Sequence, residues 1–273
     1  MKYTYANRRK IKGWLSEIDN KIFETILRYQ NDSNIVGGTA EIGLHHGKSF
    51  IPLCIYLRSN ERAYGIDLFN NQELNLDASG NGSKDKVVRN LEAFEISPDS
   101  YFLDGRSSDQ VDPVEIIDKV GRVRFFSVDG GHWEAIVEND LALASKVLAQ
   151  GGVIAIDDYL RPDWPGVAFG FHHWYRENHL EFKIFTIGFN KAYLCKSEFV
   201  ERYQEAIKKC EFLSVMKRKD YDMNGLKIPV YYNFFLPEWT FKARVYGYFQ
   251  LFHPSIFYVF KKIKKRLSSK VER

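Results

Sequence analysis

The strongest constraint on the fold is an alternation of short apolar segments with helix-like segments over residues 14–195. Four of the apolar segments carry glycine or an acidic residue at or near their ends: Ile35–Gly43, Arg62–Phe69, Arg122–Asp129 and Gly152–Asp158. Strands that alternate with helices are typical of a mainly parallel sheet with helices on both faces. We therefore predict an α/β fold with a Rossmann-like, doubly wound sheet.

Hydrophobic periodicity predicts the other elements of this fold. We expect helices at Trp14–Tyr29, Gly47–Leu57, Lys84–Glu95, Pro113–Val120, Trp133–Ala149 and Phe169–Asn178, and further strands at Ser100–Leu103, Phe182–Ile187 and Ala192–Cys195. The polar stretch Asn70–Lys84 is rich in Gly, Asn and Ser, which predicts a long loop beside the sheet.

Composition bounds the class of protein. A chain of 273 residues with 45% hydrophobic and 27% charged residues is long enough for one large globular domain, with or without an appendage. Cys54, Cys195 and Cys210 are far apart and form no C-x-x-C pair, which favours a reducing compartment and a cytoplasmic location. The first residues contain no apolar segment of the kind found in secretory signals.

The positive charge is concentrated at the C-terminus. Residues 261–273 contain seven basic residues and one acidic residue, whereas the rest of the chain has 32 basic and 34 acidic residues. A nucleic-acid enzyme more often spreads basic residues over its body, so we expect no nucleic-acid partner. The uncharged aromatic segment Val245–Phe260 precedes this tail. Three interpretations stay open: contact with an anionic membrane, packing on the core, or a subunit contact in a homo-oligomer.

Ligands of parallel α/β sheets bind beyond the carboxyl ends of the strands. The first of these ends carries Glu41, Gly43 and Gly47, and the two glycines allow a tight turn close to a ligand. The next strand ends at Asp67, where a carboxylate can accept hydrogen bonds from both ribose hydroxyls. An ordinary turn and a solvated aspartate explain these residues separately. Together they favour a nucleoside site.

Two further strand ends bring acidic residues to the same edge. Asp129 follows one strand and Asp157 and Asp158 follow the next, so the three carboxylates are expected to meet. Crowded carboxylates are costly without a cation, and oxygen ligands suit Mg²⁺ or Mn²⁺. The alternative is that the acids cap a helix or contact the ligand directly. His132 is a candidate general base, or a residue that positions its loop.

These segments resemble one family. The relevant segments are EIGLHHGKSF, YGIDLF, DGRSSD, FFSVDGGHWEAIVENDLALASKVLAQGGVIAIDDY and RPDWPGV. They are similar to class I SAM-dependent methyltransferases of the group that contains the cephalosporin-pathway and macrolide-sugar O-methyltransferases. The resemblance implies a methyltransferase domain with an N-terminal helix at residues 1–196 and a C-terminal extension at residues 197–273.

The resemblance also implies roles for individual residues. Gly43 and Gly47 would pass under the methionine end of SAM, with Glu41 near its ammonium group. Asp67 would hold the ribose, and Ser107 would lie near the adenine. The family also implies that Asp129 contacts the cofactor, that Asp129, Asp157 and Asp158 are the divalent-ion ligands, and that His132 with Asp129 is catalytic. Arg106 departs from relatives, which often have an acid there.

The expected function is therefore methyl transfer from SAM to a small polar acceptor such as a sugar hydroxyl, assisted by a divalent metal. A nicotinamide-dependent oxidoreductase is an alternative, because an acid after the second strand also serves NAD, although the chain has no G-x-G-x-x-G turn. A non-catalytic interaction protein that keeps the fold is the other alternative.

Overall fold

A computed structural model describes residues 3–216, 218–223, 225–231 and 241–271 of the chain. The strands are β1 (Gly38–Ile42), β2 (Ala63–Ile66), β3 (Tyr101–Asp104), β4 (Val123–Val128), β5 (Leu148–Ile156), β6 (Phe182–Ile187), β7 (Ala192–Lys196), β8 (Arg218–Met223) and β9 (Leu226–Tyr231). They form one sheet in the order β3-β2-β1-β4-β5-β7-β6-β9-β8. Strands β1 to β5 are parallel, and β7 runs antiparallel to β5. The expected mainly parallel α/β sheet is confirmed.

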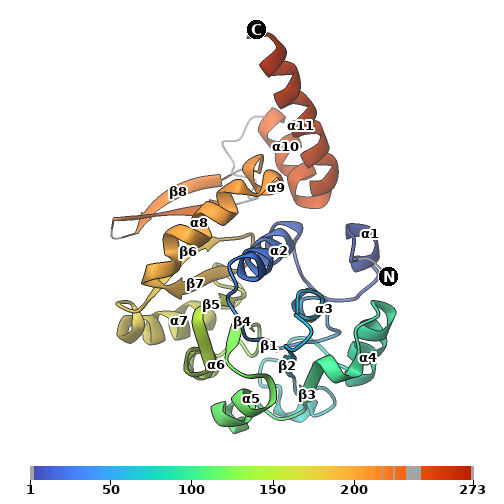
Figure 1. The fold of residues 1–273 in the computed structure, drawn as a ribbon, viewed down its shortest axis with the longest axis vertical. Coiled ribbons are helices and arrows are strands. Elements are labelled where there is room, and N and C mark those ends of the chain that lie inside the picture. The colour runs from blue at the N-terminus through green and yellow to red at the C-terminus, as the bar shows by residue number, and fades with distance from the viewer. Residues whose placement is uncertain (1–2, 217, 224, 232–240, 272–273) are drawn as a thin grey trace.

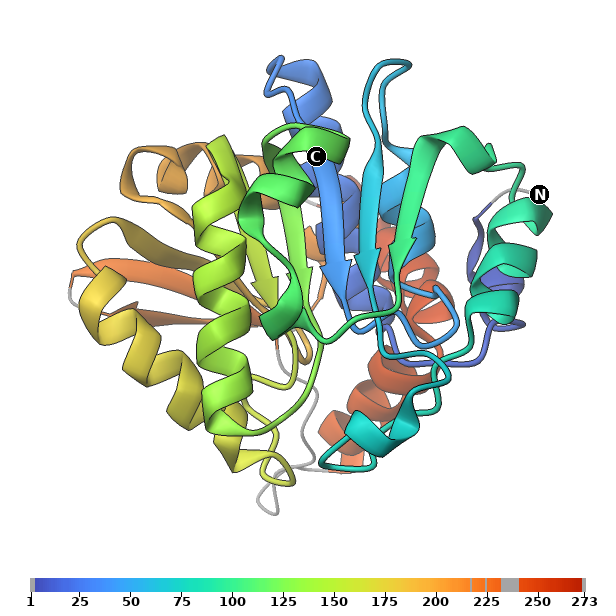
Figure 2. The ribbon, with the colours of Figure 1, turned by 90° about the horizontal axis from the view of Figure 1, so that it is seen from below.

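Helices cover both faces of this sheet. They are α1 (Tyr5–Arg8), α2 (Glu17–Asp32), α3 (Phe50–Ile55), α4 (Lys84–Ala93), α5 (Pro113–Val120), α6 (Glu134–Val147), α7 (Pro165–Asn178), α8 (Val200–Lys209), α9 (Glu211–Ser214), α10 (Phe241–Phe252) and α11 (Pro254–Val271). Helices α2, α3 and α8 pack on one face, and α5, α6 and α7 pack on the other (Figure 1). In Figure 2 the parallel strands point the same way, so their carboxyl ends share one edge of the sheet.

The pleat of each strand divides the core into two layers. Successive side chains of a strand point to opposite faces. Phe125 therefore packs against Phe23 of α2, with ring centroids 4.7 Å apart, whereas Phe126 belongs to the cluster on the other face. Helix α2 begins at Glu17 because Ser16 caps it: the Ser16 hydroxyl accepts a hydrogen bond from the backbone N–H of Asp19 at 2.9 Å.

Several boundaries differ from the sequence expectation by a few residues, and the difference at β5 has a clear cause. Strand β5 begins at Leu148, inside the segment expected to end the preceding helix at Ala149. Val123 of β4 pairs with Leu148, but Phe125 pairs with Val153, so β5 contains an irregularity between these positions. Gly151 has φ of 76°, a conformation that glycine adopts without strain. Pairing with β4 thus overrides the helical pattern at residues 148–149.

The described part of the C-terminal segment continues the same core. Tyr203 of α8 is buried and lies within hydrogen-bond distance of Gln30 of α2, at 3.0 Å. Strand β9 extends the sheet by pairing with β6 at Val230 and Ile187. The division at residue 196 stays a prediction. Helices α10 and α11 lie side by side at one end of the molecule (Figure 1). No helix among the described residues is both long and apolar enough to span a membrane.

Candidate active site

A cavity of about 410 Å³ opens at the carboxyl ends of the parallel strands. This volume is within the range of small-molecule sites, roughly 300–1,000 Å³. The loop that follows β2, residues 70–83, forms one wall, as expected for a long loop at this edge. Sequence-predicted residues in the walls are Gly43, Asp67, Ser107, Asp129, His132, Asp157 and Asp158.

The turn after β1 requires glycine. Gly43 has φ of 84°, and a Cβ placed there would lie 1.7 Å from the carbonyl oxygen of Asp129. The backbone of β1 therefore reaches the cavity beside β4 without a side chain in between. His45 in the same turn also has positive φ, at 51°. Such strained conformations concentrate at ligand sites, where the surrounding fold enforces them.

Asp67 is fixed at the end of β2. Its Oδ2 accepts a hydrogen bond from the backbone N–H of His45 at 2.7 Å, and its Oδ1 accepts one from Phe69 at 2.6 Å. Burial raises the pKa of Asp67 above its usual value. A carboxylate accepts about four hydrogen bonds, so two vicinal hydroxyls can still bind to Asp67 from the cavity.

Glu41 and Gly47 lie behind the cavity rather than in its described walls. The side chain of Glu41 is fully buried, and burial raises its pKa to about 7. Gly47 has φ of 83° and faces Val87 of α4. Gly43 and Asp67 line the cavity, whereas Glu41 and Gly47 do not, and contact of all four residues with a cofactor stays a prediction.

The loop after β3 is held from two sides. Ser107 faces the cavity, and the hydroxyl of the adjacent Ser108 donates to Asp140 of α6 at 2.5 Å. Asp140 is buried, which raises its pKa to about 7. On the other side, the Arg106 guanidinium lies 2.7 Å from carboxylate oxygens of both Asp104 and Glu115. The residue that departs from the family pattern therefore braces this loop.

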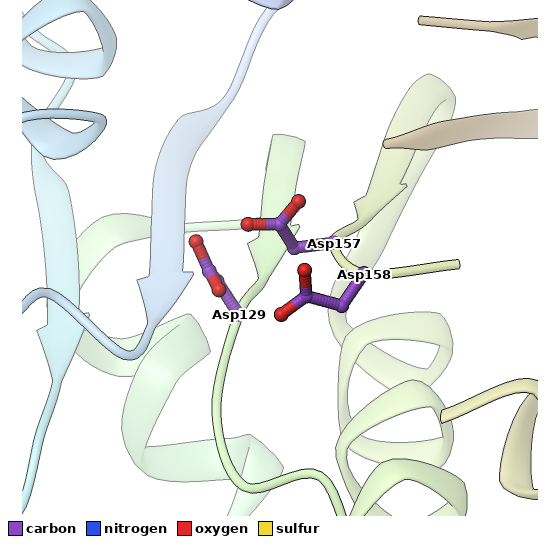
Figure 3. A group of neighbouring side chains, drawn as sticks. All are labelled: Asp129, Asp157 and Asp158. Atoms are coloured by element: carbon purple, nitrogen blue, oxygen red, sulfur yellow. The ribbon is translucent and has the colours of Figure 1, made fainter. Parts of the chain in front are cut away.

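The three carboxylates predicted from the strand ends do meet. Asp129 follows β4, Asp157 and Asp158 follow β5, and one carboxylate oxygen of each lies within 4.8 Å of the others (Figure 3). Asp158 has φ of 54°, so its backbone is also in the left-handed region. Burial, followed by the charge of Asp157, raises the pKa of Asp129 well above its usual value.

A buried lysine lies among these acids. Lys191 Nζ is 3.0 Å from Asp129 Oδ2 and 2.8 Å from Asp157 Oδ2, and the residue is only 1% exposed. Burial disfavours its charge, but Asp129 and Asp157 outweigh burial and raise the pKa of Lys191. The preceding Asn190 donates from Nδ2 to Asp157 Oδ1 at 2.8 Å and to Asp158 Oδ1 at 2.6 Å.

His132 lies between two carboxylates. Its Nε2 is 2.9 Å from Asp158 Oδ2, and its Nδ1 is 2.7 Å from Asp77 Oδ2. Burial disfavours the imidazolium, but hydrogen bonds to the two aspartates outweigh burial and raise the pKa of His132. Trp164 stacks on the imidazole with centroids 4.1 Å apart. The ring is therefore held on both edges and on one face.

Sequence reasoning missed Asp77, Trp164, Asn190 and Lys191 as site residues. Asp77 is in the predicted long loop, and no spacing rule relates it to His132, 55 residues away. Asn190 and Lys191 occupy the turn between β6 and β7, where two polar residues interrupt an apolar sequence. That interruption is the only hint in the sequence that these two residues have a special position. Their proximity to the acids at the ends of β4 and β5 follows from the fold alone.

The acid cluster has the donor chemistry that Mg²⁺ or Mn²⁺ prefers, since all its ligands are carboxylate oxygens. In the described part of the chain, however, N–H donors already face both oxygens of Asp157 and of Asp158, and Oδ2 of Asp129. The three carboxylates alone would suit a divalent ion, but Lys191 already occupies oxygens that such an ion would bind.

The fold and the cavity define a class of protein: an α/β enzyme with a small-molecule cavity at the carboxyl edge of its sheet. A family model described as "Methyltransferase domain" matches residues 40–159. This segment contains part of β1, all of β2 to β5 and most of the cavity walls. Residues 40–159 therefore form a methyltransferase domain.

Solved structures share the fold. The O-methyltransferase NovP aligns with a TM-score of 0.52 at 15% identity, over 64% of this chain and 79% of that one. Cofactor-bound Rv0187 from MTB aligns with a TM-score of 0.51 at 14% identity, over 70% and 86%. At this identity the likeness establishes the fold. No curated protein matches the sequence.

Proposed function

We propose that the protein transfers a methyl group from SAM to an oxygen of a small polar acceptor, such as a sugar hydroxyl. One observation carries this proposal: a single cavity joins a nucleoside-type wall, with Gly43 and Asp67, to an acidic end that contains His132. The first part suits the adenosyl group, and the second suits a hydroxyl that must lose a proton.

Charge and positioning explain how such a site works. SAM is a sulfonium cation, so an in-line displacement by the acceptor oxygen discharges it. Holding the two reactants in line supplies the largest part of the rate enhancement. In the proposed mechanism the acceptor hydroxyl replaces Asp158 at Nε2 of His132, and His132 takes its proton while Asp77 stabilises the resulting imidazolium at Nδ1.

A divalent ion bound at this end would be held by Asp129, Asp157 and Asp158 and would lower the pKa of the acceptor hydroxyl. Every step described for His132 proceeds without it.

The acceptor end of the cavity supports a sugar-like substrate. Trp164 gives it a flat apolar wall, and the Arg161 and His132 side chains give it polar groups. Sites with one aromatic face and a few convergent polar groups bind small molecules with amphipathic rings.

Transfer of a labelled methyl group tests the function. Purified protein is incubated with methyl-labelled SAM and a panel of sugars, nucleotide sugars and phenols, and the product is identified by mass spectrometry and NMR. We expect an O-methyl product, with loss of labelling in His132→Ala. Labelling on nitrogen or carbon would contradict O-methylation.

Ligand-dependent stability separates the other two functions. A ligand that binds the folded state raises its unfolding temperature. We expect stabilisation by SAM and none by NAD. Stabilisation by NAD alone would favour the oxidoreductase, and stabilisation by neither would favour a non-catalytic interaction protein.

We also propose that α10 and α11 contact an anionic membrane from the cytoplasmic side. Both helices expose large apolar side chains at helical spacing: Val245, Tyr248, Phe249, Phe252, Ile256, Val259, Phe260 and Ile263. The adjoining residues 261–273 carry a net charge of +6, although the side chains from residue 265 onward lie outside the described ones. Like charges disfavour a second copy at this face and favour anionic lipid.

A further inference from the structure

The acid cluster raises a question of charge balance. Asp129 and Asp157 are close together in a largely buried setting, where two carboxylates cannot both ionise without a nearby positive charge. A divalent ion is one solution. This chain contains another, because the Lys191 ammonium lies within 3.0 Å of both acids.

The position of Lys191 is built into the fold. The backbone N–H of Gly188 donates to the carbonyl of Lys191 at 2.8 Å and closes the turn between β6 and β7. Asp19 of α2 accepts from the backbone N–H of Asn190 at 3.2 Å, and Tyr159 donates from its backbone to the Asn190 carbonyl at 3.3 Å. The turn is therefore fixed from three sides, and its lysine points into the cluster.

A metal ion would need the oxygens that this lysine uses. Mg²⁺ binds carboxylate oxygens at about 2.0–2.1 Å. Such an ion on Asp129 Oδ2 and Asp157 Oδ2 would place a double positive charge next to the buried ammonium. Lys191 is 1% exposed, so moving it into water would require the turn to open.

We propose that Lys191 is the resident cation of this acid cluster and takes the place of a divalent ion, so that the enzyme works without a metal. This inference rests on the proposed function for its catalytic meaning, but its central claim concerns cation binding alone. The ammonium balances Asp129 and Asp157 and holds their carboxylates in place.

A Mn²⁺ titration followed by electron paramagnetic resonance tests the claim without an acceptor. Wild-type protein with SAM present should show no saturable Mn²⁺ site that depends on Asp157, and EDTA should leave its unfolding temperature unchanged. A single Mn²⁺ site in the wild type that disappears in Asp157→Asn would overturn the proposal, whether or not methyl transfer is detected.

Substitution of the lysine tests the competition directly. Lys191→Met removes the charge at similar length, so the freed acids should bind Mn²⁺ at one saturable site, with an affinity at least about tenfold above any residual binding by the wild type. Lys196→Ala, at the other end of β7, pairs with the more exposed Glu181 and is the matched control. A folded Lys191→Met protein with no gain would contradict the proposal. If that variant does not fold, the wild-type titration decides.

Discussion

Asp77 binds His132 twice: its Oδ2 accepts a hydrogen bond from the backbone N–H at 2.8 Å and lies 2.7 Å from the ring Nδ1. A carboxylate can only accept, so the ring donates from Nδ1 to Asp77 and, while it is charged, from Nε2 to Asp158. Once Nε2 loses its proton and leaves Asp158, it can act as a base while Nδ1 stays bound to Asp77. Since Asp77 belongs to the loop of residues 70–83, this contact connects the loop to the proposed base.

His132→Ala should lower kcat by about 10²–10⁴-fold, because the acceptor would lose its general base. SAM affinity should change little, since His132 lies at the acceptor end. Steady-state kinetics and calorimetry measure the two effects. His173→Ala is the control, because that exposed histidine pairs with Glu134 instead. Activity within a few-fold of wild type would assign His132 to loop positioning.

Asp77→Asn should shift the pH dependence of kcat. His132 acts as a base only when it is neutral, so the rate rises as pH increases through its pKa. The two aspartates raise that pKa above its usual value of 6.5. Replacing one carboxylate by an amide should move the midpoint of the acidic limb to lower pH. An unchanged midpoint would show that Asp77 does not control His132.

Asp67→Ala should weaken SAM binding by about 1–3 kcal/mol, because the ribose hydroxyls would lose a buried acceptor. Isothermal titration calorimetry measures the change. Asp99→Ala, on the exposed turn before β3, is the control and should bind SAM as the wild type does. Equal affinity in a folded Asp67→Ala protein would remove Asp67 from the cofactor site.

Arg124→Ala should destabilise the fold by about 3–5 kcal/mol, because the buried Glu61 loses its closer cationic partner and keeps only Arg58, at 3.5 Å. Arg124 is fully buried and lies 2.9 Å from Glu61 Oε2 near the amino end of β4, away from the cavity. Urea denaturation measures the loss of unfolding free energy. The folded Arg124→Ala variant should still bind SAM. Arg122→Ala, an exposed neighbour, should cost less than about 1 kcal/mol.

The full-length chain should sediment with anionic liposomes at low salt, remain in solution with neutral ones, and be released at high salt. The Debye length falls from about 10 Å at 0.1 M to about 3 Å at 1 M, so electrostatic attraction weakens. Phe252→Asp with Phe260→Asp should reduce binding, whereas Leu180→Asp, an exposed leucine in the loop between α7 and β6, should not. Failure to bind, together with a dimer that these substitutions disrupt, would favour a subunit contact.

Much of the fold follows from local pattern. Apolar segments at strand spacing and amphipathic segments at helical spacing predict β1 to β7 and α2 to α7, because local burial requirements determine both periods. The predicted start of β5 was wrong. Residues 148–149 fit a helical pattern, but the pairing of Leu148 with Val123 makes them part of the strand. The hairpin of β8 and β9 carries no clear alternation and was not predicted.

The sequence by itself determined the α/β class, the glycine turn at Gly43, and the approach of Asp129 to Asp157. Parallel strands bring their carboxyl ends to one edge, so residues at those ends must be neighbours. Only the tertiary structure decided that Lys191 lies between those acids and that Asp77 holds His132. These contacts join turns and loops that are distant in sequence, and no local periodicity encodes which distant side chains a loop will meet.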